Sequence, residues 1–344
     1  MRVRPHIGHV NLAKAYRGGE RQTQILIEQL AERGWQQTLV ARVGGDLARR
    51  IGKLDGLTLI TANNVVGAAS ALAKTQLVHA HDGRSIQAAC LANLRFGHRY
   101  LVTRRVMNPI GDNLLTRFMY RRAKACVAIS SAVAESVLEY DSRLRCEQIA
   151  DAYHAVEPDP VMAAEYRARS SFDLMIGNVA ALETDSKGQL TMLAAARAMP
   201  ETGFRLIGSG RDEQMLKAAA GDLPNLVFEG QVQDVASHLA AMDIFAFPSL
   251  REGFGSVLLD AMRQGLPIVA FASGGIPDIV VDGLNGQLLP PGDDAGFIAA
   301  LRRMAAEPDL RKQFAENNRR RAERFTPTIM TDNYERLYLK LSNR

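Results

Sequence analysis

The sequence predicts an α/β protein with two Rossmann-like, doubly wound domains that face each other across a cleft. Three observations support this prediction. Short apolar runs typical of strands alternate with helical patterns along most of the chain. The 344 residues are enough for two domains of ordinary size. A proline-containing stretch near residue 158 interrupts the alternation, which then begins again. Such alternation is typical of parallel sheets with helices on both faces.

In the first half of the chain, the apolar runs predict strands and the segments between them predict helices. Ile25, Leu26 and Leu30 recur at helical spacing, which indicates a helix over residues 20–33, and Gly34 is a suitable stop. Strands are expected at residues 7–12, 37–41, 77–80, 100–103 and 125–129, with further helices near 86–94 and over 113–124.

In the second half the same pattern is repeated and ends in a helix over residues 330–341. The expected strands are 173–177, 204–207, 226–228, 244–247, 267–270 and 286–289. The predicted division is an N-terminal domain over 1–157, a linker over 158–171, a C-terminal domain over 172–325, and a C-terminal helix over 326–344 that packs back on the N-terminal domain. Ligands of open α/β sheets bind at the carboxyl ends of the strands.

The composition is that of a globular protein. Apolar residues make up 47% of the chain and charged residues 23%, which excludes collagen, coiled coil and wholesale disorder. No apolar run approaches the roughly 20 residues that span a bilayer, and none follows the basic N-terminus as in a secretory signal. The three cysteines are scattered, which favours reduced thiols and a cytoplasmic location.

Positive charge is concentrated in the first half of the chain. Residues 1–157 hold 22 Lys and Arg against 13 Asp and Glu, whereas the remainder is mildly acidic. A basic half suits nucleic acid, an anionic lipid surface or an acidic acceptor, and charge alone does not choose among them. No helix-turn-helix, RNA-binding aromatic pair or zinc finger is recognisable, so nucleic acid is not expected as a partner.

Residues 249–262 are the segment most suggestive of a ligand site. A strand that ends at Pro248 is followed by a glycine-flanked turn and an apolar helix, and the free amides at a helix N-terminus bind anions. Gly253 and Gly255 allow a ligand to approach the backbone closely. The carboxylates of Glu252 and Asp260 would accept hydrogen bonds from sugar and ribose hydroxyls. The plainer alternative is a carboxylate that only stabilises the helix dipole.

The stretch from Glu252 to Asp260 resembles the E-x7-E signature of retaining glycosyltransferases with the GT-B fold, especially family 4. Short motifs in matching order extend the resemblance over most of the chain; they lie at residues 17–21, 78–82, 127–130, 186–188, 207–210, 265–269, 274–278 and 334–338. Two positions depart from the family pattern. Asp260 stands where the family usually has Glu, and residues 179–182 lack the Arg that often precedes the lysine matching Lys187.

The resemblance implies that the N-terminal domain, 1–157, binds the acceptor. It also implies that the C-terminal domain, 172–325, binds a UDP- or GDP-linked sugar as co-substrate, with no metal and no other cofactor. Lys187 would neutralise the diphosphate as a point cation, Glu252 would hold hydroxyls of the transferred sugar, and Asp260 would hold the ribose. The other expected donor-binding residues are Gly18, Gly19, Gly208, Gly253, Phe254, Gly255 and Ser256. For Gly208, a plain strand-to-helix turn is an equally suitable interpretation.

His81, Glu252 and Lys187 are the expected catalytic residues. If the strand continues past Ala80, the side chains of His79 and His81 share a face; if it ends there, His81 is free to turn into the cleft. The family match places His81 near the sugar and the acceptor, and the alternative is a buried histidine with satisfied hydrogen bonds. A zinc site is not expected, because no third ligand with suitable spacing is visible.

Arg104 and Arg105 follow the 100–103 strand at its expected cleft end and suit an acidic or phosphorylated acceptor. Residues 113–124 have two interpretations. They form either a basic amphipathic helix that lies on an anionic membrane, or a helix whose Leu115, Phe118 and Met119 belong to the core while its arginines are solvated.

Together these features predict a cytoplasmic, retaining hexosyltransferase, or one peripheral at the inner face of the cytoplasmic membrane. It would move a sugar to a glycan or glycolipid acceptor in lipopolysaccharide or surface polysaccharide biosynthesis. The resemblance suggests a front-face displacement without a covalent sugar–enzyme intermediate. The alternatives are a sugar-nucleotide epimerase or hydrolase on the same fold, and a non-catalytic module that binds anions or nucleic acid.

Overall fold

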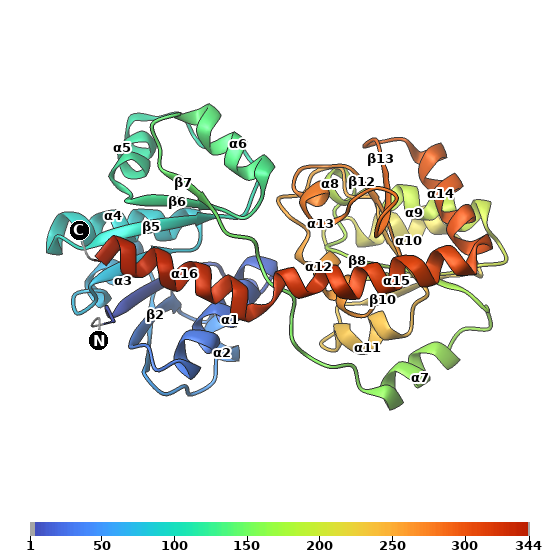
Figure 1. Ribbon diagram of the computed structural model, residues 1–344, viewed down its shortest axis with the longest axis horizontal. Coiled ribbons are helices and arrows are strands. Elements are labelled where there is room, and N and C mark those ends of the chain that lie inside the picture. The colour runs from blue at the N-terminus through green and yellow to red at the C-terminus, as the bar shows by residue number, and fades with distance from the viewer. Residues whose placement is uncertain (1–3, 343–344) are drawn as a thin grey trace. The chain divides into compact units, whose positions relative to one another are not determined.

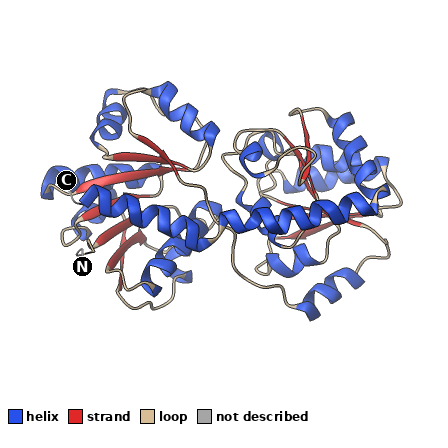
Figure 2. Ribbon diagram, in the orientation of Figure 1, coloured by secondary structure: helices blue, strands red, loops and turns tan. Residues whose placement is uncertain are grey.

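The computed structural model describes residues 4–342 and contains two α/β units. The first unit comprises the chain up to Ala152 together with the segment from Thr326 onward, and the second is Tyr153–Phe325. Figures 1 and 2 show that, in each unit, helices lie on both faces of one twisted sheet. The predicted fold class, two Rossmann-like domains with parallel sheets, is confirmed.

The first unit contains a seven-stranded parallel sheet with strand order β3-β2-β1-β4-β5-β6-β7. The chain reverses its direction of progress across the sheet between β1 and β4, where open sheets of this kind bind ligands. The strands are β1 (Ile7–Asn11), β2 (Gln37–Arg42), β3 (Leu57–Ala62), β4 (Leu77–Ala80), β5 (Arg99–Arg104), β6 (Ala125–Ala128) and β7 (Cys146–Gln148). The helices between them are α1 (Gly18–Glu32), α2 (Asp46–Arg50), α3 (Val65–Ala71), α4 (Gly83–Phe96), α5 (Leu114–Arg122) and α6 (Ser131–Tyr140).

The second unit contains a six-stranded parallel sheet with strand order β10-β9-β8-β11-β12-β13. Its strands are β8 (Met175–Val179), β9 (Gly203–Ile207), β10 (Leu226–Gly230), β11 (Ile244–Phe247), β12 (Ile268–Phe271) and β13 (Gly286–Leu289). Its helices are α7 (Pro160–Ala168), α8 (Thr184–Lys187), α9 (Gln189–Ala198), α10 (Glu213–Ala220), α11 (Val235–Ala240), α12 (Ser256–Arg263), α13 (Ile276–Ile279), α14 (Asp294–Ala306) and α15 (Pro308–Ala322), followed by the short helix η1 (Glu323–Phe325).

Strand side chains alternate between two apolar layers in the first unit, as the period of a strand requires. Tyr100 and Val102 of β5 pack with residues of α3 and α4, whereas Leu101 between them packs on the opposite face. Helix boundaries follow local signals. The Asp82 carboxylate accepts from the backbone N–H groups of Arg84 and Ser85 and begins α4, and Gly97 ends that helix with a φ of 75°.

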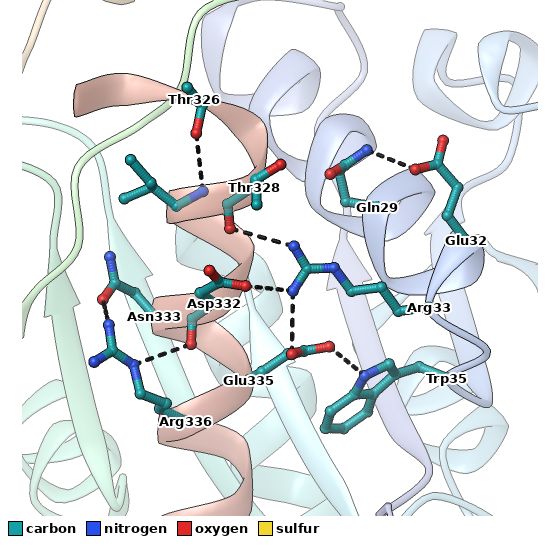
Figure 3. Close-up of polar contacts among 11 residues, drawn as sticks. Gln29, Glu32, Arg33, Trp35, Thr326, Thr328, Asp332, Asn333, Glu335 and Arg336 are labelled. Atoms are coloured by element: carbon teal, nitrogen blue, oxygen red, sulfur yellow. Dashed lines mark hydrogen bonds and ion pairs between the residues drawn. The ribbon is translucent and has the colours of Figure 1, made fainter. Parts of the chain in front are cut away.

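The last helix of the chain, α16 (Pro327–Ser342), completes the core of the first unit. Its Tyr334, Leu337 and Tyr338 are buried in one cluster with side chains from α1 and the sheet. Figure 3 shows the polar edge of this contact, where Trp35 Nε1 donates to Glu335 at 2.6 Å and Arg33 pairs with Asp332 at 2.6 Å. Because exposed ion pairs contribute little, the apolar face supplies most of the stabilisation.

The boundary between the units differs from the sequence-based expectation. The first unit ends at Ala152 and not at residue 157, because Arg263 of α12 donates to the Val156 carbonyl at 3.0 Å and lies 5.3 Å from the Tyr153 ring centroid. The expected linker, 158–171, contains α7. The proline pair that suggested a linker is instead a helix start, with Asp159 as N-cap and proline in the first turn.

We predict that Leu337→Ala lowers the free energy of unfolding of the first unit by about 2–5 kcal/mol, because it leaves a cavity where α16 packs on the sheet. Leu337 is buried in that cluster. The chain has a single tryptophan, Trp35, in the first unit, so its fluorescence in a urea titration reports this unit. Arg336→Ala, an exposed change one residue away, is the control. Equal midpoints and slopes for both variants would contradict the role assigned to α16.

Candidate functional site

The loop from Pro248 to Gly255 is fixed to the end of α8 by hydrogen bonds to one carbonyl. The backbone N–H groups of Leu250 and Arg251 donate to the Ser186 oxygen at 2.9 and 3.1 Å. The Ser249 hydroxyl donates to the same oxygen at 3.0 Å. This carbonyl directly precedes Lys187, so the loop after β11 is held beside the lysine side chain.

Lys187 and Glu252 form an ion pair with a distance of 2.6 Å between Lys187 Nζ and Glu252 Oε2. Both side chains are largely buried, with 21% and 15% of their surface exposed, so solvent screens the pair less than it would at the surface. The sequence assigned both residues to the donor, and the structure brings them together. Charge-assisted bonds of this kind are short and strong. An incoming diphosphate would therefore compete with Glu252 for the lysine.

Two glycines allow neighbouring loops to approach this site closely. Gly188 has a φ of +66°, and a Cβ there would lie 2.0 Å from the Pro248 oxygen. Gly274 has a φ of +51°, and a Cβ there would lie 1.8 Å from the backbone carbonyl oxygen of Glu252. The next residue, Gly275, donates its N–H to that oxygen at 3.1 Å. Glycine is required at both positions by conformation and by space.

Helix α12 begins at Ser256, after the glycine-flanked turn that follows Glu252, as the sequence predicted. Gly255 is its N-cap with a φ of +83°, Gly253 is buried, and Ser256 is the first helical residue. Phe254, expected among the donor-binding residues, is 2% exposed and lies 6.1 Å from the Phe325 ring. Its side chain therefore contributes packing, and a contact of this residue with the donor stays a prediction.

Asp260 is buried inside α12, where its carboxylate accepts a hydrogen bond from the backbone N–H of His154 at 2.7 Å. This bond fixes the segment after Ala152 to α12. The expected contact with ribose stays a prediction, and the aspartate already has a structural role.

Gly208, another expected donor residue, is required by its backbone environment. Its φ is +136°, and a Cβ would lie 1.9 Å from the Ala180 oxygen. Its N–H donates to the Gly230 oxygen at 2.8 Å. These observations favour the plain turn that the sequence also allowed, and a nucleotide contact stays a prediction.

In the first unit, three buried histidines lie together at the carboxyl ends of β1 and β4. His9 Nδ1 and His81 Nε2 are 3.0 Å apart, and the rings of His79 and His81 lie 3.8 Å apart. Strand β4 ends at Ala80, but His81 does not turn away, because its backbone N–H still donates to the Val10 oxygen at 3.0 Å. Sequence reasoning missed His9, which is distant along the chain and adjacent only through the pairing of β1 with β4.

His79 is buried with hydrogen-bond partners at both ring nitrogens. Its Nδ1 lies 2.7 Å from the Tyr338 hydroxyl, and its Nε2 lies 2.6 Å from the Thr103 hydroxyl. The Thr103 oxygen in turn lies 2.9 Å from the Tyr334 hydroxyl. Helix α16 is thus connected by hydrogen bonds to the strand that positions His81.

Burial lowers the pKa of all three histidines, so each is neutral at pH 7. Desolvation is the largest cause in each case and lowers the pKa of His9 to about 3. Arg105 lowers the pKa of His79 and His81 further. Its guanidinium lies 3.5 Å from His81 Nδ1. Since arginine can only donate, Nδ1 accepts, and Nε2 carries the proton that faces His9.

Neither arginine expected to bind the acceptor is presented freely. Arg105 is buried and pairs with the buried Asp151 at 3.4 Å. Arg104 contacts the Asn108 carbonyl, and its other nitrogen lies 3.5 Å from the Tyr120 hydroxyl. Their contact with an acceptor stays a prediction, and both side chains have internal partners.

Gly18 and Gly19 are the first two residues of α1, as expected for a turn that opens this helix. A Cβ on Gly19 would lie 3.5 Å from the Arg105 side chain. The structure therefore places the start of α1, Arg105 and His81 close to one another, and this grouping agrees with the sequence-based assignment of these residues to one region.

A second basic group lies at the same edge of the sheet, where sequence reasoning did not assign a site. A hollow of about 460 Å³ is lined by Leu12, Ala13, Lys14, Arg42, Asp82, Gly83 and Arg84. These residues end β2 or directly follow β1 and β4. Within residues 4–342, Lys14, Arg42 and Arg84 have no ion pair. Their position directly after strands was the signal that could have indicated them.

Nitrogen atoms of His9, His79 and His81 all lie within 4.8 Å of one another, so the distances alone would permit a metal ion. The surroundings do not favour one. Both nitrogens of His79 have hydroxyl partners, and a cation would lie beside the permanently charged Arg105. A metal-independent protein stays the prediction.

Residues 173–307 match the family Glycosyl transferases group 1. The matched residues lie within the second unit. Over 157 residues the chain is 32% identical to the lipopolysaccharide core biosynthesis glycosyltransferase LpsE of Rhizobium meliloti, covering 44% of this chain and 46% of that protein. Over 164 residues it is 32% identical to the phosphatidyl-myo-inositol mannosyltransferase of Mycolicibacterium smegmatis, covering 45% and 42%. The match thus spans less than half the length of either relative.

Solved structures show the same fold over nearly the whole chain. The Anabaena protein HepE in complex with UDP and glucose superposes with a TM-score of 0.85 at 17% identity, covering 99% of this chain and 100% of that chain. The lipopolysaccharide outer core galactosyltransferase WaaB gives a TM-score of 0.73 at 17% identity, covering 98% and 100%. These similarities confirm the predicted GT-B fold. Among residues 4–342, no helix is both long enough and apolar enough to cross a membrane.

We predict that acid destabilises the first unit through the three neutral histidines. Their pKa values are lower in the folded protein than the ordinary 6.5 of the unfolded chain, so the stabilisation is complete above pH 6.5 and is lost as the pH falls. Below pH 6.5, each histidine lowers the free energy of unfolding by up to about 1.4 kcal/mol per pH unit, and the three together lower it by up to about 4 kcal/mol per unit.

Urea titrations followed by Trp35 fluorescence between pH 7 and 5.5 measure this loss. In His79→Gln the slope should fall by about a third relative to its own stability at pH 7, because one proton-binding group is gone. A variant slope identical to that of the wild type would refute the assignment of a neutral His79.

Proposed function

We propose that the protein is a retaining glycosyltransferase that moves a hexose from a UDP- or GDP-linked sugar to a glycan or glycolipid acceptor. The single observation that carries the proposal is the Lys187–Glu252 pair, held beside the start of α12 within the matched domain. The relatives LpsE and WaaB, by their names, act in lipopolysaccharide core synthesis. We extend that role, the assembly of a bacterial surface glycan, to this chain as part of the proposal.

In the donor site, the lysine and the helix N-terminus act on the leaving group. The diphosphate draws Lys187 away from Glu252, and the amides at Gly255 and Ser256 complete its coordination. Glu252, released from the lysine, accepts hydrogen bonds from hydroxyls of the sugar. One ion pair thereby supplies both a cation for the phosphate and an anion for the sugar.

Retention follows from a front-face displacement. The acceptor hydroxyl attacks the anomeric carbon on the side from which the diphosphate leaves, and the departing phosphate oxygen takes its proton. The protein positions the two reactants and stabilises the negative charge that develops on the diphosphate. Trapping a covalent glycosyl–enzyme adduct would rule out this mechanism.

In the first unit, His81 and the basic hollow serve the acceptor. A neutral imidazole can orient a hydroxyl without adding charge. Because the ring nitrogens of His81 contact His9 and Arg105, the acceptor hydroxyl would replace one of these two partners. Lys14, Arg42 and Arg84 suit a phosphate or carboxylate group on the acceptor. The reduced cysteines and a nucleotide-sugar substrate support a cytoplasmic location.

We predict that Lys187→Ala weakens the binding of UDP roughly 10- to 150-fold, because one charge-assisted contact is lost and Glu252 is left facing the phosphates. A thermal-shift screen with UDP, GDP, ADP and their sugars first identifies the nucleotide; at 100 times its dissociation constant, a ligand should stabilise the protein by about 2.7 kcal/mol. Lys217→Ala, a change in an exposed pair of α10, is the control. A full nucleotide shift in the Lys187 variant would disprove the donor site.

We predict that His81→Asn preserves nucleotide binding and lowers turnover roughly 10- to 100-fold, since it disturbs the position of the acceptor and not the grip on the diphosphate. Transfer of labelled sugar to glycolipid acceptors measures turnover, and NMR of the product measures the anomeric configuration. His98→Asn in the same unit is the control. Loss of nucleotide binding in the His81 variant would contradict the division of roles.

An incubation without acceptor separates the proposal from its rivals. An epimerase would change the sugar nucleotide and a hydrolase would consume it rapidly, whereas a transferase leaves it largely intact. An inverted product would retain the transferase proposal but refute the front-face mechanism.

A further inference from the structure

Helix α5 exposes apolar side chains that no part of the described chain covers. Leu114 is 88% exposed, Leu115 63% and Phe118 42%, whereas Met119 and Tyr120 on the other side of the helix are buried. The sequence left open whether Leu115, Phe118 and Met119 belong to the core. Only Met119 does, because the helix meets the sheet unit through that side alone.

The exposed side chains form one continuous face. Leu114, Phe118 and Arg122 are four residues apart and therefore neighbours on the helix surface. The Arg122 guanidinium lies over the Phe118 ring at 5.3 Å from its centroid. Arg121 of the same helix is exposed, and so is Lys124, two residues after the helix ends. The α5 face, as we use the term below, consists of Leu114, Leu115, Phe118, Arg121, Arg122 and Lys124.

Positive charge is concentrated in the segment that carries this face. Residues 83–124 contain nine lysines and arginines but a single acidic residue, Asp112. Asp112 pairs with Arg117, and Asp141 pairs with Arg121 at 2.7 Å. The partner of Arg122 is the neutral Asn93, so its charge is not compensated by that contact. Apolar side chains thus lie directly beside positive charge that carboxylates do not fully neutralise.

We propose that the α5 face docks on the surface of an anionic phospholipid bilayer. The leucines and the phenylalanine enter the boundary between headgroups and acyl chains, and the cations contact lipid phosphates. Apolar side chains with adjacent cations bind an anionic membrane surface through burial of the apolar groups and attraction to the lipid phosphates. The proposal rests on the α5 face alone. It does not require that the protein transfers sugar.

Two other occupants fit the α5 face less well. A second copy of the chain would bring the same cations of both copies together in a two-fold interface, which like-charge repulsion opposes. Single-stranded nucleic acid is bound by a basic groove together with aromatic rings on which successive bases stack, and this face offers one ring, already covered by Arg122.

The test uses the full chain in vesicle flotation, with phosphatidylcholine vesicles and with vesicles of equal parts phosphatidylcholine and phosphatidylglycerol. We expect binding to the anionic vesicles only. Replacing Leu114, Leu115 and Phe118 by Ser should lower the vesicle partition coefficient at least tenfold. Replacing Arg121, Arg122 and Lys124 by Gln should have an effect of the same size.

Matched controls lie elsewhere in the first unit. Val43, Leu59 and Val66 are 47%, 41% and 60% exposed, and their replacement by Ser removes exposed apolar surface of the same kind. Arg49, Arg50 and Lys53 replaced by Gln remove three exposed charges. Both control variants should bind as the wild type does. Unchanged Trp35 fluorescence unfolding and an unchanged UDP shift show that the test variants are folded and that the donor site is separate.

Three results would overturn the proposal. The first is the absence of binding to anionic vesicles. The second is a serine variant that binds as well as the wild type, since attraction would then be charge alone. The third is equal loss in the test and control variants. A dimer in sedimentation velocity, or an oligonucleotide complex, that requires the α5 face in a protein without vesicle binding would assign the face to that other partner.

Discussion

The contact between Lys187 and Glu252 is the interaction on which the chemistry of the second unit depends. Neither residue has a fixed position by itself, because Lys187 ends a single-turn helix and Glu252 lies on a loop. The Ser186 carbonyl and the glycines at 188 and 274 bring the two segments together at distances that a side chain would prevent. The backbone contacts therefore bring the charged pair together. The charges of Lys187 and Glu252 are then available to bind a ligand.

The polar interior of the first unit contains neutral hydrogen-bonding groups and not an ion pair alone. Three histidines occupy a buried site that lowers the pKa of their rings, and the hydroxyls of Tyr338 on α16 and Thr103 on β5 contact both ring nitrogens of His79. Such a network specifies one arrangement, because a misplaced partner leaves a buried polar atom unsatisfied. In acid, the histidines bind protons more readily in the unfolded chain than in the folded unit, so a lower pH destabilises the fold. The arrangement gives His81 a fixed ring orientation without giving it a charge.

The sequence predicted what depends on local pattern. Apolar runs located most strands, and the glycine-flanked turn after Pro248 located the start of α12. It did not anticipate β3, whose residues are half exposed and lack a buried run, nor α7, whose prolines resemble a linker. It also missed contacts made across strands, such as His9 with His81 and Arg105 with Asp151. Whether Phe118 is exposed or buried depends on what packs against α5, and the spacing of apolar residues in the helix contains no information on that.

The place of α16 has a consequence for the biosynthesis of the chain. The unit made first lacks part of its interior until the last helix has been translated, since Tyr334 and Tyr338 fill the cluster around Trp35 and Leu26. While the ribosome is still producing the second unit, the first presents an uncovered apolar sheet face and unpaired histidines. Nascent chains in this state are candidates for binding by chaperones. A chain truncated before α16 could not complete the core of the first unit and would remain bound to the chaperone.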